Sequence, residues 1–189
     1  MTESYKNSFF TDGRVAISTA RAGNVIGGGD FAVDRILPDC VRAIESNKSI
    51  ILRNPNSTRP YQHVLESISA YLLIAMRQYE DSTLQGSYNV GPNEASCITT
   101  EKLVSIFSQI WQEHTGEELK IKYSKNNEPH EAHFLKLDCS KIKNMIGWYP
   151  KWDYKMMLEK TAVWTECYVK QDDVVKEMET EIREYLLKL

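Results

Sequence analysis

The chain has 189 residues, of which 42% are hydrophobic and 26% charged, and its formal net charge is -3. This composition is typical of a folded globular domain and excludes a disordered chain. Lysine and arginine are scattered along the sequence, so no basic surface for nucleic acid is expected, and no run approaches the ~18 apolar residues of a membrane span. We therefore expect no nucleic-acid partner and no membrane partner.

The four cysteines lie far apart in the sequence, at Cys40, Cys97, Cys139 and Cys167. They form no C-x-x-C pair, which argues against a metal cluster and against a dense disulfide framework. No signal peptide opens the chain. These features predict a reducing compartment and a cytoplasmic protein.

Helical and strand patterns alternate along the first half of the chain. The small and β-branched residues of RVAISTAR suit a strand inside a parallel sheet, and the apolar residues of the longer segments recur at helical spacing. Proline and asparagine in NPNSTRP favour a turn. In chain order we expect the end of a helix at 2–10, a strand at 14–21, a helix at 33–46, a strand at 49–53, a turn-rich segment at 54–60, a helix at 61–79 and a strand at 86–92.

The second half continues the alternation less regularly. Threonine caps and glycine stops mark its helices, and alternating apolar residues mark its strands. The order of the elements predicts an α/β fold. We expect a helix from Thr99 or Thr100 to Gly116, strands at 119–123 and 132–138, a helix at 140–145 before Gly147, and a helix at 153–169.

The last segment, from residue 172 to the end, predicts a helix with one apolar stripe. The stripe consists of Val175, Met178, Ile182, Tyr185 and Leu189. Two interpretations stay open, a terminal helix docked on its own domain and a helix for self-association. Two heptads are short for a coiled coil, which favours the docked helix.

Residues 20–30, ARAGNVIGGGD, concentrate glycine directly after a predicted strand. Gly27, Gly29 and Ala32 fit the G-x-G-x-x-A form of a dinucleotide-binding turn, but the next strand ends in Arg53 where that fingerprint expects an acid. A plain tight turn is a second interpretation, because glycine accepts positive φ. The third, which we favour, is a loop at the carboxyl end of a parallel strand that lines a ligand crevice.

Several blocks of the sequence, in order and at matching spacing, carry a family resemblance. ARAGNVIGGGD, DRILPDCVRAI, ILRNPNSTRPYQHVLE and PHEAHFLKLDCSKIKNMIGWYPKW resemble the C-terminal half of extended short-chain dehydrogenases/reductases of the nucleotide-sugar epimerase/dehydratase family. RAGNVIGGGD, NPNSTRPYQHVLE and PHEA resemble the branch that acts on CDP-glucose. The resemblance implies the C-terminal portion of a Rossmann-type fold, with late parallel strands and a small α/β substrate-binding lobe.

The same resemblance implies a division of the chain into three parts. Residues 1–30 would hold the end of a helix and a late strand of the sheet. Residues 31–170 would form mainly the nucleotide-sugar-binding lobe, with 61–91 returning a helix and a strand to the sheet. Residues 171–189 would form a C-terminal helix.

Five residues take site roles from the resemblance. Ala22 and Gly23 would pass the nicotinamide end of a bound NAD, where small residues let the backbone approach closely. Asn24 would hydrogen-bond the sugar nucleotide near its phosphates, since an amide both donates and accepts. Arg59 would grip the pyrophosphate, because a planar guanidinium meets two phosphate oxygens at once. Arg35 would help from the helix start, although a solvated surface charge is an equal alternative there.

His130 and Glu131 stand where many relatives carry an arginine near the nucleotide, and we include them among the substrate-binding residues with their role open. The sequence HEAH around them is one residue short of H-E-x-x-H, so its two imidazoles would not share a helical face. We therefore expect no metal site there.

The reaction that the resemblance implies needs residues that this sequence does not hold. NAD takes a hydride from the sugar, water is lost across C5 and C6, and the hydride returns, with a Tyr-x-x-x-Lys pair as the base. Tyr5 is followed at the fourth position by Phe9, and no such pair stands elsewhere.

We therefore expect a fragment of a CDP-glucose 4,6-dehydratase that is inactive alone. One alternative is another epimerase or dehydratase of nucleotide sugars. The other is a non-catalytic domain that binds a nucleotide sugar. A homo-oligomer or an N-terminal partner chain would be its protein partner.

Overall fold

A computed structural model describes residues 2–12, 14–124 and 135–187. Seven α-helices, seven strands and two 3₁₀ turns are present in these ranges. In order they are α1 (Thr2–Phe9), β1 (Thr19–Ala22), β2 (Asn24–Ile26), α2 (Ile36–Glu45), β3 (Ile50–Leu52), β4 (Thr58–His63), α3 (Val64–Glu80), η1 (Ser82–Leu84), β5 (Ser87–Val90), η2 (Glu94–Ser96), β6 (Cys97–Thr99), α4 (Thr100–Thr115), β7 (Ile121–Tyr123), α5 (Ser140–Ile146), α6 (Tyr154–Val169) and α7 (Val174–Leu187).

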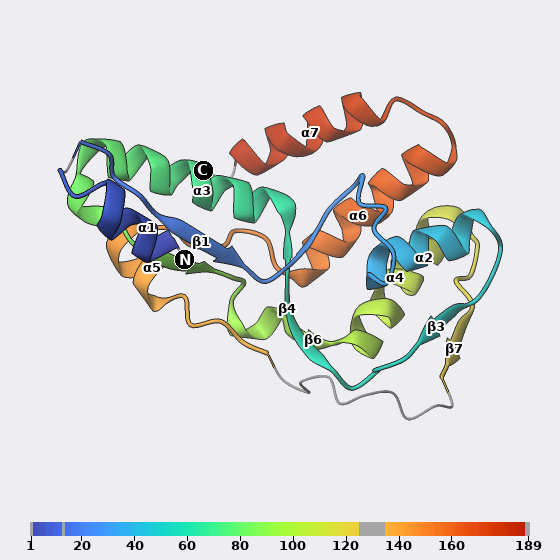
Figure 1. Cartoon of the computed structure of the whole chain (residues 1–189). Helices are drawn as coiled ribbons and strands as arrows, with labels where there is room; N and C mark the ends of the chain where they lie inside the picture. Colours follow the sequence, from blue (N-terminus) through green and yellow to red (C-terminus); the bar gives the residue numbers. More distant parts are fainter. Residues whose placement is uncertain (1, 13, 125–134, 188–189) are drawn as a thin grey trace.

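The strands form three small sheets. β1 pairs with β5 and β3 pairs with β7, both in parallel, while β4 lies between β2, to which it is parallel, and β6, to which it is antiparallel. Figure 1 shows β4 between a part that holds α1, β1, α3 and α5 and a part that holds α2, α4, α6, β3 and β7. The mixture of helices with mainly parallel strands confirms the α/β prediction.

Two hydrophobic clusters are present among the described residues. The first gathers side chains from α2, β3, β4, α4 and α6 around Leu103 and Phe107, which are fully buried. The second joins α3, β5 and α5 through Ile74, Tyr88 and Ile142. Helix α7 lies against α6, and no helix among the described residues is both long and apolar enough to cross a membrane.

Helix ends follow the predicted caps closely. Thr99 accepts a hydrogen bond from the Lys102 amide at the start of α4, and Gly116 closes that helix with φ +77°. Gly147 closes α5 in the same left-handed conformation, with φ +78°. Both glycines stand where a residue with a Cβ would be strained, so the two predicted stops are confirmed.

Strand β4 is the main departure from the sequence prediction. The predicted turn through residue 60 and the predicted helix from residue 61 are wrong, because residues 58–63 form a strand and α3 begins at Val64. Five of the six β4 residues are buried, so the strand lacks the alternation that identifies a half-exposed strand. Pro60 also argues against a strand, but it sits opposite Cys97 at the last pair of the antiparallel ladder.

Two other predicted strands are shorter or absent in the described residues. The strand predicted at 14–21 begins only at Thr19, and it breaks at Gly23 before continuing as β2. Of the strand predicted at 132–138, residues 132–134 lie outside the described residues and residues 135–138 form no strand.

Helix α7 forms and docks on its own chain, but not through the predicted apolar stripe. Its buried side chains are Glu181 and Tyr185. Val175, Met178 and Ile182 are exposed, and Leu189 lies outside the described residues. The predicted stripe is therefore wrong at Val175, Met178 and Ile182, and the helix docks through Glu181 and Tyr185 instead.

We predict that Asp153→Ala destabilises the protein by about 1 kcal/mol in urea unfolding. The Asp153 carboxylate accepts from the amides of Lys155 and Met156 at the start of α6, and alanine leaves both amides without that acceptor. Asp153→Asn keeps an acceptor oxygen and should lose much less. Equal losses in the two variants would show that the cap is not the cause.

Candidate functional site

A crevice of about 860 Å³ opens beside β2 and β4. Its walls come from β2 and the glycine-rich segment after it, the start of α2, the end of β3, the first part of β4 and one face of α6. A crevice outside the carboxyl end of parallel strands is where α/β proteins bind ligands, and this volume is within the usual range for a small-molecule site. The residues that line it and enter the argument are Gly23, Asn24, Gly27, Gly29, Asp30, Asp34, Arg35, Asp39, Arg53, Arg59 and Trp164.

Asn24 reaches the crevice because the chain changes partner at Gly23. The Gly23 amide donates to the Val90 carbonyl at 3.2 Å, and the next residue joins β4 opposite Tyr61. A Cβ at Gly23 would lie 2.6 Å from the Pro60 carbonyl oxygen, so only glycine fits here. Ala22 ends β1 opposite Val90, outside the crevice lining.

Arg59 enters the wall of the crevice from β4. Its residue is only 8% exposed, and one guanidinium nitrogen, Nη1, donates to the Thr58 carbonyl at 3.1 Å. A cation held largely out of water attracts an anion more strongly than an exposed one, because solvent screens it less. The geometry therefore suits an anionic ligand at this end of the crevice.

Arg35, by contrast, points to solvent. Its side chain is 63% exposed, and it pairs with Asp30 at 3.3 Å. This position is that of a solvated surface charge, which was one of the two alternatives for Arg35. The residue nevertheless belongs to the crevice lining. An exposed ion pair of this kind contributes little to stability.

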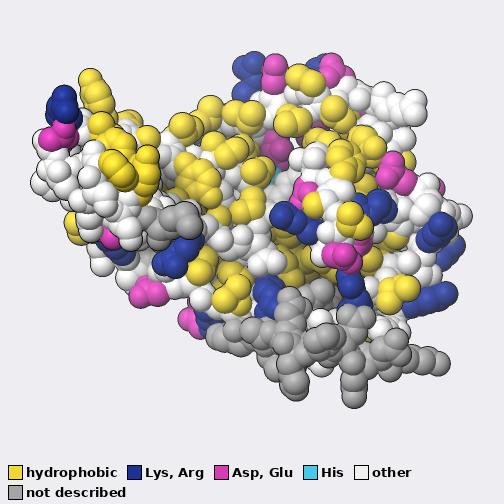
Figure 2. Space-filling model, viewed as in Figure 1, with side chains coloured by type: hydrophobic (Ala, Val, Ile, Leu, Met, Phe, Trp, Pro, Cys, Tyr) yellow, Lys and Arg dark blue, Asp and Glu magenta, His cyan; other side chains and the backbone are white. Residues whose placement is uncertain are grey.

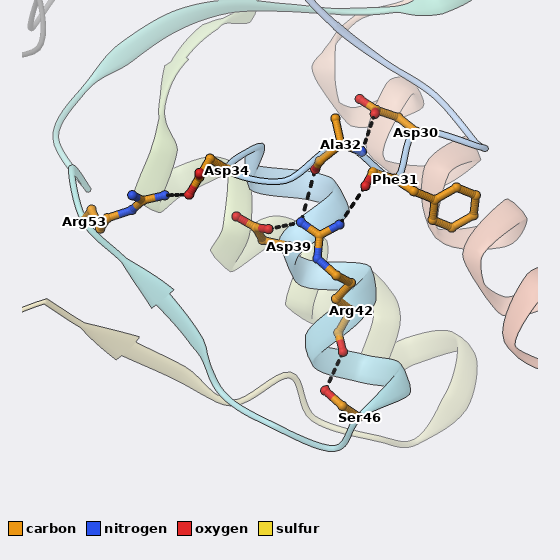
Figure 3. Close-up of polar contacts among 8 residues, drawn as sticks. All are labelled: Asp30, Phe31, Ala32, Asp34, Asp39, Arg42, Ser46 and Arg53. Atoms are coloured by element: carbon orange, nitrogen blue, oxygen red, sulfur yellow. Dashed lines mark hydrogen bonds and ion pairs between the residues drawn. The ribbon is translucent and has the colours of Figure 1, made fainter.

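Arginine side chains fix the segment between the glycines and α2 (Figure 3). Arg42 donates to the carbonyls of Phe31 and Ala32 at 3.0 and 3.1 Å and pairs with Asp39. Arg53, at the end of β3, pairs with Asp34. Asp34 has φ +61°, a conformation that asparagine and aspartate tolerate better than most residues, so its ion pair supports an otherwise strained turn.

The three consecutive glycines are needed for two different reasons. A Cβ at Gly27 would lie 2.6 Å from Val64, and one at Gly28 would lie 2.3 Å from the Trp164 ring. Gly29 has φ +79°. Close packing explains the first two glycines, and backbone conformation explains the third.

The position of α2 decides between the interpretations of this segment. In a dinucleotide-binding turn the glycines open a helix, but α2 begins only at Ile36 and Ala32 lies in the turn before it. Gly27 and Gly29 instead line the crevice, as the third interpretation predicts.

Helix α6 also contributes to the crevice, which the sequence did not predict. Trp164, Thr161 and Thr165 line the crevice, and the Trp164 ring stacks on Tyr168 with centroids 5.3 Å apart. The helix was predicted, but its periodicity does not show that this face would meet the glycine-rich segment.

The described lining of the crevice does not include His130, Glu131 or Cys40. His130 and Glu131 lie outside the described residues, and no cluster that could hold a metal occurs within the described ranges. Burial, and then the charge of Asp39, raise the pKa of the Cys40 thiol, so this buried cysteine on α2 is a poor nucleophile.

Comparison with known proteins relates the chain to enzymes of nucleotide-sugar metabolism. A family model described as GDP-mannose 4,6 dehydratase matches residues 1–161. The CDP-glucose 4,6-dehydratase of Salmonella typhimurium is 38% identical over 192 aligned residues, which cover 98% of this chain and 52% of that protein. The chain thus spans about half the length of this curated relative.

Solved structures share the fold at lower identity. The UDP-N-acetylglucosamine 4-epimerase of Methanobrevibacter ruminantium superposes with a TM-score of 0.71 at 22% identity, over 89% of this chain and 51% of that one. The dTDP-glucose 4,6-dehydratase of Bacillus anthracis, solved with NAD, gives 0.66 at 19% identity, over 86% and 47%. These neighbours confirm the predicted Rossmann-type short-chain dehydrogenase fold over about half of their length.

We predict that Gly28→Ala destabilises the protein by about 1–3 kcal/mol, because the new methyl group overlaps the Trp164 ring. Urea unfolding of Gly28→Ala, Trp164→Leu and the double variant forms a double-mutant cycle. The two changes should couple, with the double variant more stable than the sum of the single losses predicts. Strict additivity would show that the contact with the indole does not require the glycine.

Proposed function

The chain belongs to the GDP-mannose 4,6 dehydratase family of nucleotide-sugar enzymes, and from this membership we propose that it forms the substrate-binding half of a CDP-glucose 4,6-dehydratase. The observation that carries the proposal is Arg59, a largely buried arginine in the wall of a crevice that also holds Asn24. A diphosphate is the part of a nucleotide sugar that a buried guanidinium binds best, because it accepts two parallel hydrogen bonds.

The choice of CDP-glucose rests on sequence similarity to the Salmonella enzyme. That relative is named for CDP-glucose, and it is similar to this chain over nearly all of its length. Its identity of 38% is well above that of the epimerase neighbours. His130 and Glu131 remain proposed contacts to the nucleotide sugar.

NAD would supply the hydride acceptor and donor in this reaction, and the described residues fit only one end of it. We propose Ala22 and Gly23 as the residues beside its nicotinamide end. The close contact with Pro60 already explains why Gly23 has no side chain, so this glycine alone is weak support. No glycine-rich turn among the described residues opens a helix, so the NAD phosphates would bind to another part of the working protein.

The incomplete sheet supports a second half that holds the cofactor. Within the described residues, β1 pairs with β5 alone, and parallel strands are normally covered on both faces. Figure 2 shows hydrophobic side chains gathered over the region of α1 and α3, and Tyr5, Phe9, Leu72 and Met76 are exposed there. We propose that a cofactor-binding segment or partner chain packs on this face.

A non-catalytic domain that binds nucleotide sugars is the second candidate. The specific observation in its favour is that the sequence contains no Tyr-x-x-x-Lys pair. The crevice and Arg59 would suit a catalytic half and a binding domain equally well. A turnover measurement must therefore distinguish the two functions.

We predict that CDP binds to the chain and that Arg59→Ala raises its Kd by about ten- to a hundredfold, since a charge-assisted hydrogen bond contributes ~1.5–3 kcal/mol. Isothermal titration calorimetry measures the change. Arg59→Lys keeps the charge but not the planar guanidinium, and its Kd for CDP should lie between those of the wild type and Arg59→Ala. Arg77→Ala, on α3 outside the crevice, is the control. Unchanged affinity in a folded Arg59→Ala variant would reject the role.

We also predict that the chain alone, given CDP-glucose and NAD, forms no product lighter by one water. The base that the reaction needs would come from the cofactor-holding half. Mass spectrometry of the nucleotide sugar checks this directly. Adding the N-terminal half of the Salmonella relative in trans should restore turnover if this chain is the substrate half. A binding-only domain would stay inactive in that mixture.

A further inference from the structure

Helix α7 is anchored by polar side chains. Glu181 and Tyr185 are its buried residues, while most of its apolar side chains face outward. The Tyr185 hydroxyl donates to Glu66 Oε2 at 2.9 Å and lies 2.8 Å from Ser69 Oγ. Both partners belong to the first turns of α3. Docking of α7 therefore depends on specific contacts with the start of that helix.

Glu66 is the centre of this anchor. It is fully buried, and its other oxygen, Oε1, accepts from the amides of Lys151 and Trp152 at 2.9 and 2.7 Å. The Lys151 ammonium also stands 4.6 Å from the centroid of the Tyr185 ring. A buried carboxylate that lost the tyrosine hydroxyl would keep an unsatisfied oxygen, which is strongly unfavourable.

Glu181 contacts the residue that joins β4 to α3. Its Oε1 lies 3.2 Å from His63 Nε2, at ion-pair distance though without hydrogen-bond alignment. His63 Nδ1 accepts from the Leu65 amide and so caps α3. Nδ1 is occupied by the Leu65 amide, and Nε2 is the ring nitrogen that faces Glu181.

The same junction touches the crevice. His63 pairs with Ile26, the last residue of β2, and Gly27 packs against Val64 so closely that no Cβ fits. Arg59 lies on the same strand as His63. A shift of the junction would therefore move both the glycine-rich segment and the strand that carries the arginine.

We propose that Glu181 and Tyr185 are positioning residues for the nucleotide-sugar crevice, acting through His63 and Glu66 on residues 27–29 and 58–63. This inference rests on the proposed function only for the identity of the ligand. The buried polar residues of the QHVLE sequence thereby join the C-terminal helix to the binding site. Docked α7 holds the crevice in one shape, and the loss of either contact loosens it.

Hydrogen–deuterium exchange of the full chain tests the proposal without ligand. Tyr185→Phe keeps the ring and removes only the hydroxyl, and Glu181→Gln keeps the shape and removes the charge. In both variants the amides of α7, of 27–29 and of 58–63 should exchange about tenfold faster, as expected for the loss of one buried polar contact. Amides of α4 are the internal reference and should not change. Ile182→Ala, an exposed site on the same helix, is the matched control.

Ligand linkage gives the second readout. If α7 positions the crevice, CDP must protect the amides of α7 in the wild type, because coupling between two sites is reciprocal. Tyr185→Phe should abolish that protection and raise the Kd for CDP severalfold. Faster exchange confined to α7, with 27–29 and 58–63 unchanged, would overturn the proposal. Absence of CDP binding to the wild type would reject the proposed function instead, and the exchange result without ligand would still decide this inference.

Discussion

The close approach of Gly23 to the Pro60 carbonyl sets the geometry on which the crevice depends. At this point the chain leaves its ladder with β5 and joins β4, with one hydrogen bond to Val90 closing the first ladder. A side chain at position 23 would push the two strands apart, since its Cβ would meet the carbonyl at 2.6 Å. Arg59 precedes Pro60, and Asn24 follows Gly23. This contact, which only glycine allows, thus brings the two predicted phosphate ligands to the same wall.

The elements that the sequence predicted well are those whose signals are local. The ends of α4 and α5 depend on a threonine cap or a glycine in the left-handed region, and both features are set by residues within one turn. Strand β4 has no such signal. Its strand character depends on pairing with β2 and β6, which lie more than thirty residues away on either side. A proline and a continuous buried run were therefore interpreted as a turn and the start of a helix.

Part of the candidate site was predicted from the family resemblance. Without that resemblance, the same residues would have been interpreted as polar or charged residues of exposed loops. Asn24, Arg35 and Arg59 do line one crevice, although they come from separate segments. What the sequence could not show is how differently the two arginines are placed. Arg35 precedes a helix and reaches solvent, whereas Arg59 is buried on β4, a strand that the sequence did not predict. The face of Trp164 was missed for the same reason, since only the tertiary fold brings α6 under the glycines.

Arginines and aspartates both line the crevice. The three arginines therefore differ less in charge than in how far they are buried. Among the described residues, the lining contains Arg35, Arg53 and Arg59 together with Asp30, Asp34 and Asp39, and the formal charges of these six cancel. The two exposed arginines pair with two of the aspartates and hold the segment before α2 in shape. Solvent and salt weaken those outer pairs as they would any surface pair. Arg59 is the most buried of the three, and it lies on β4, where we propose that the diphosphate binds. The same strand ends at the junction that α7 contacts, so the position of this arginine depends on how firmly that strand is fixed.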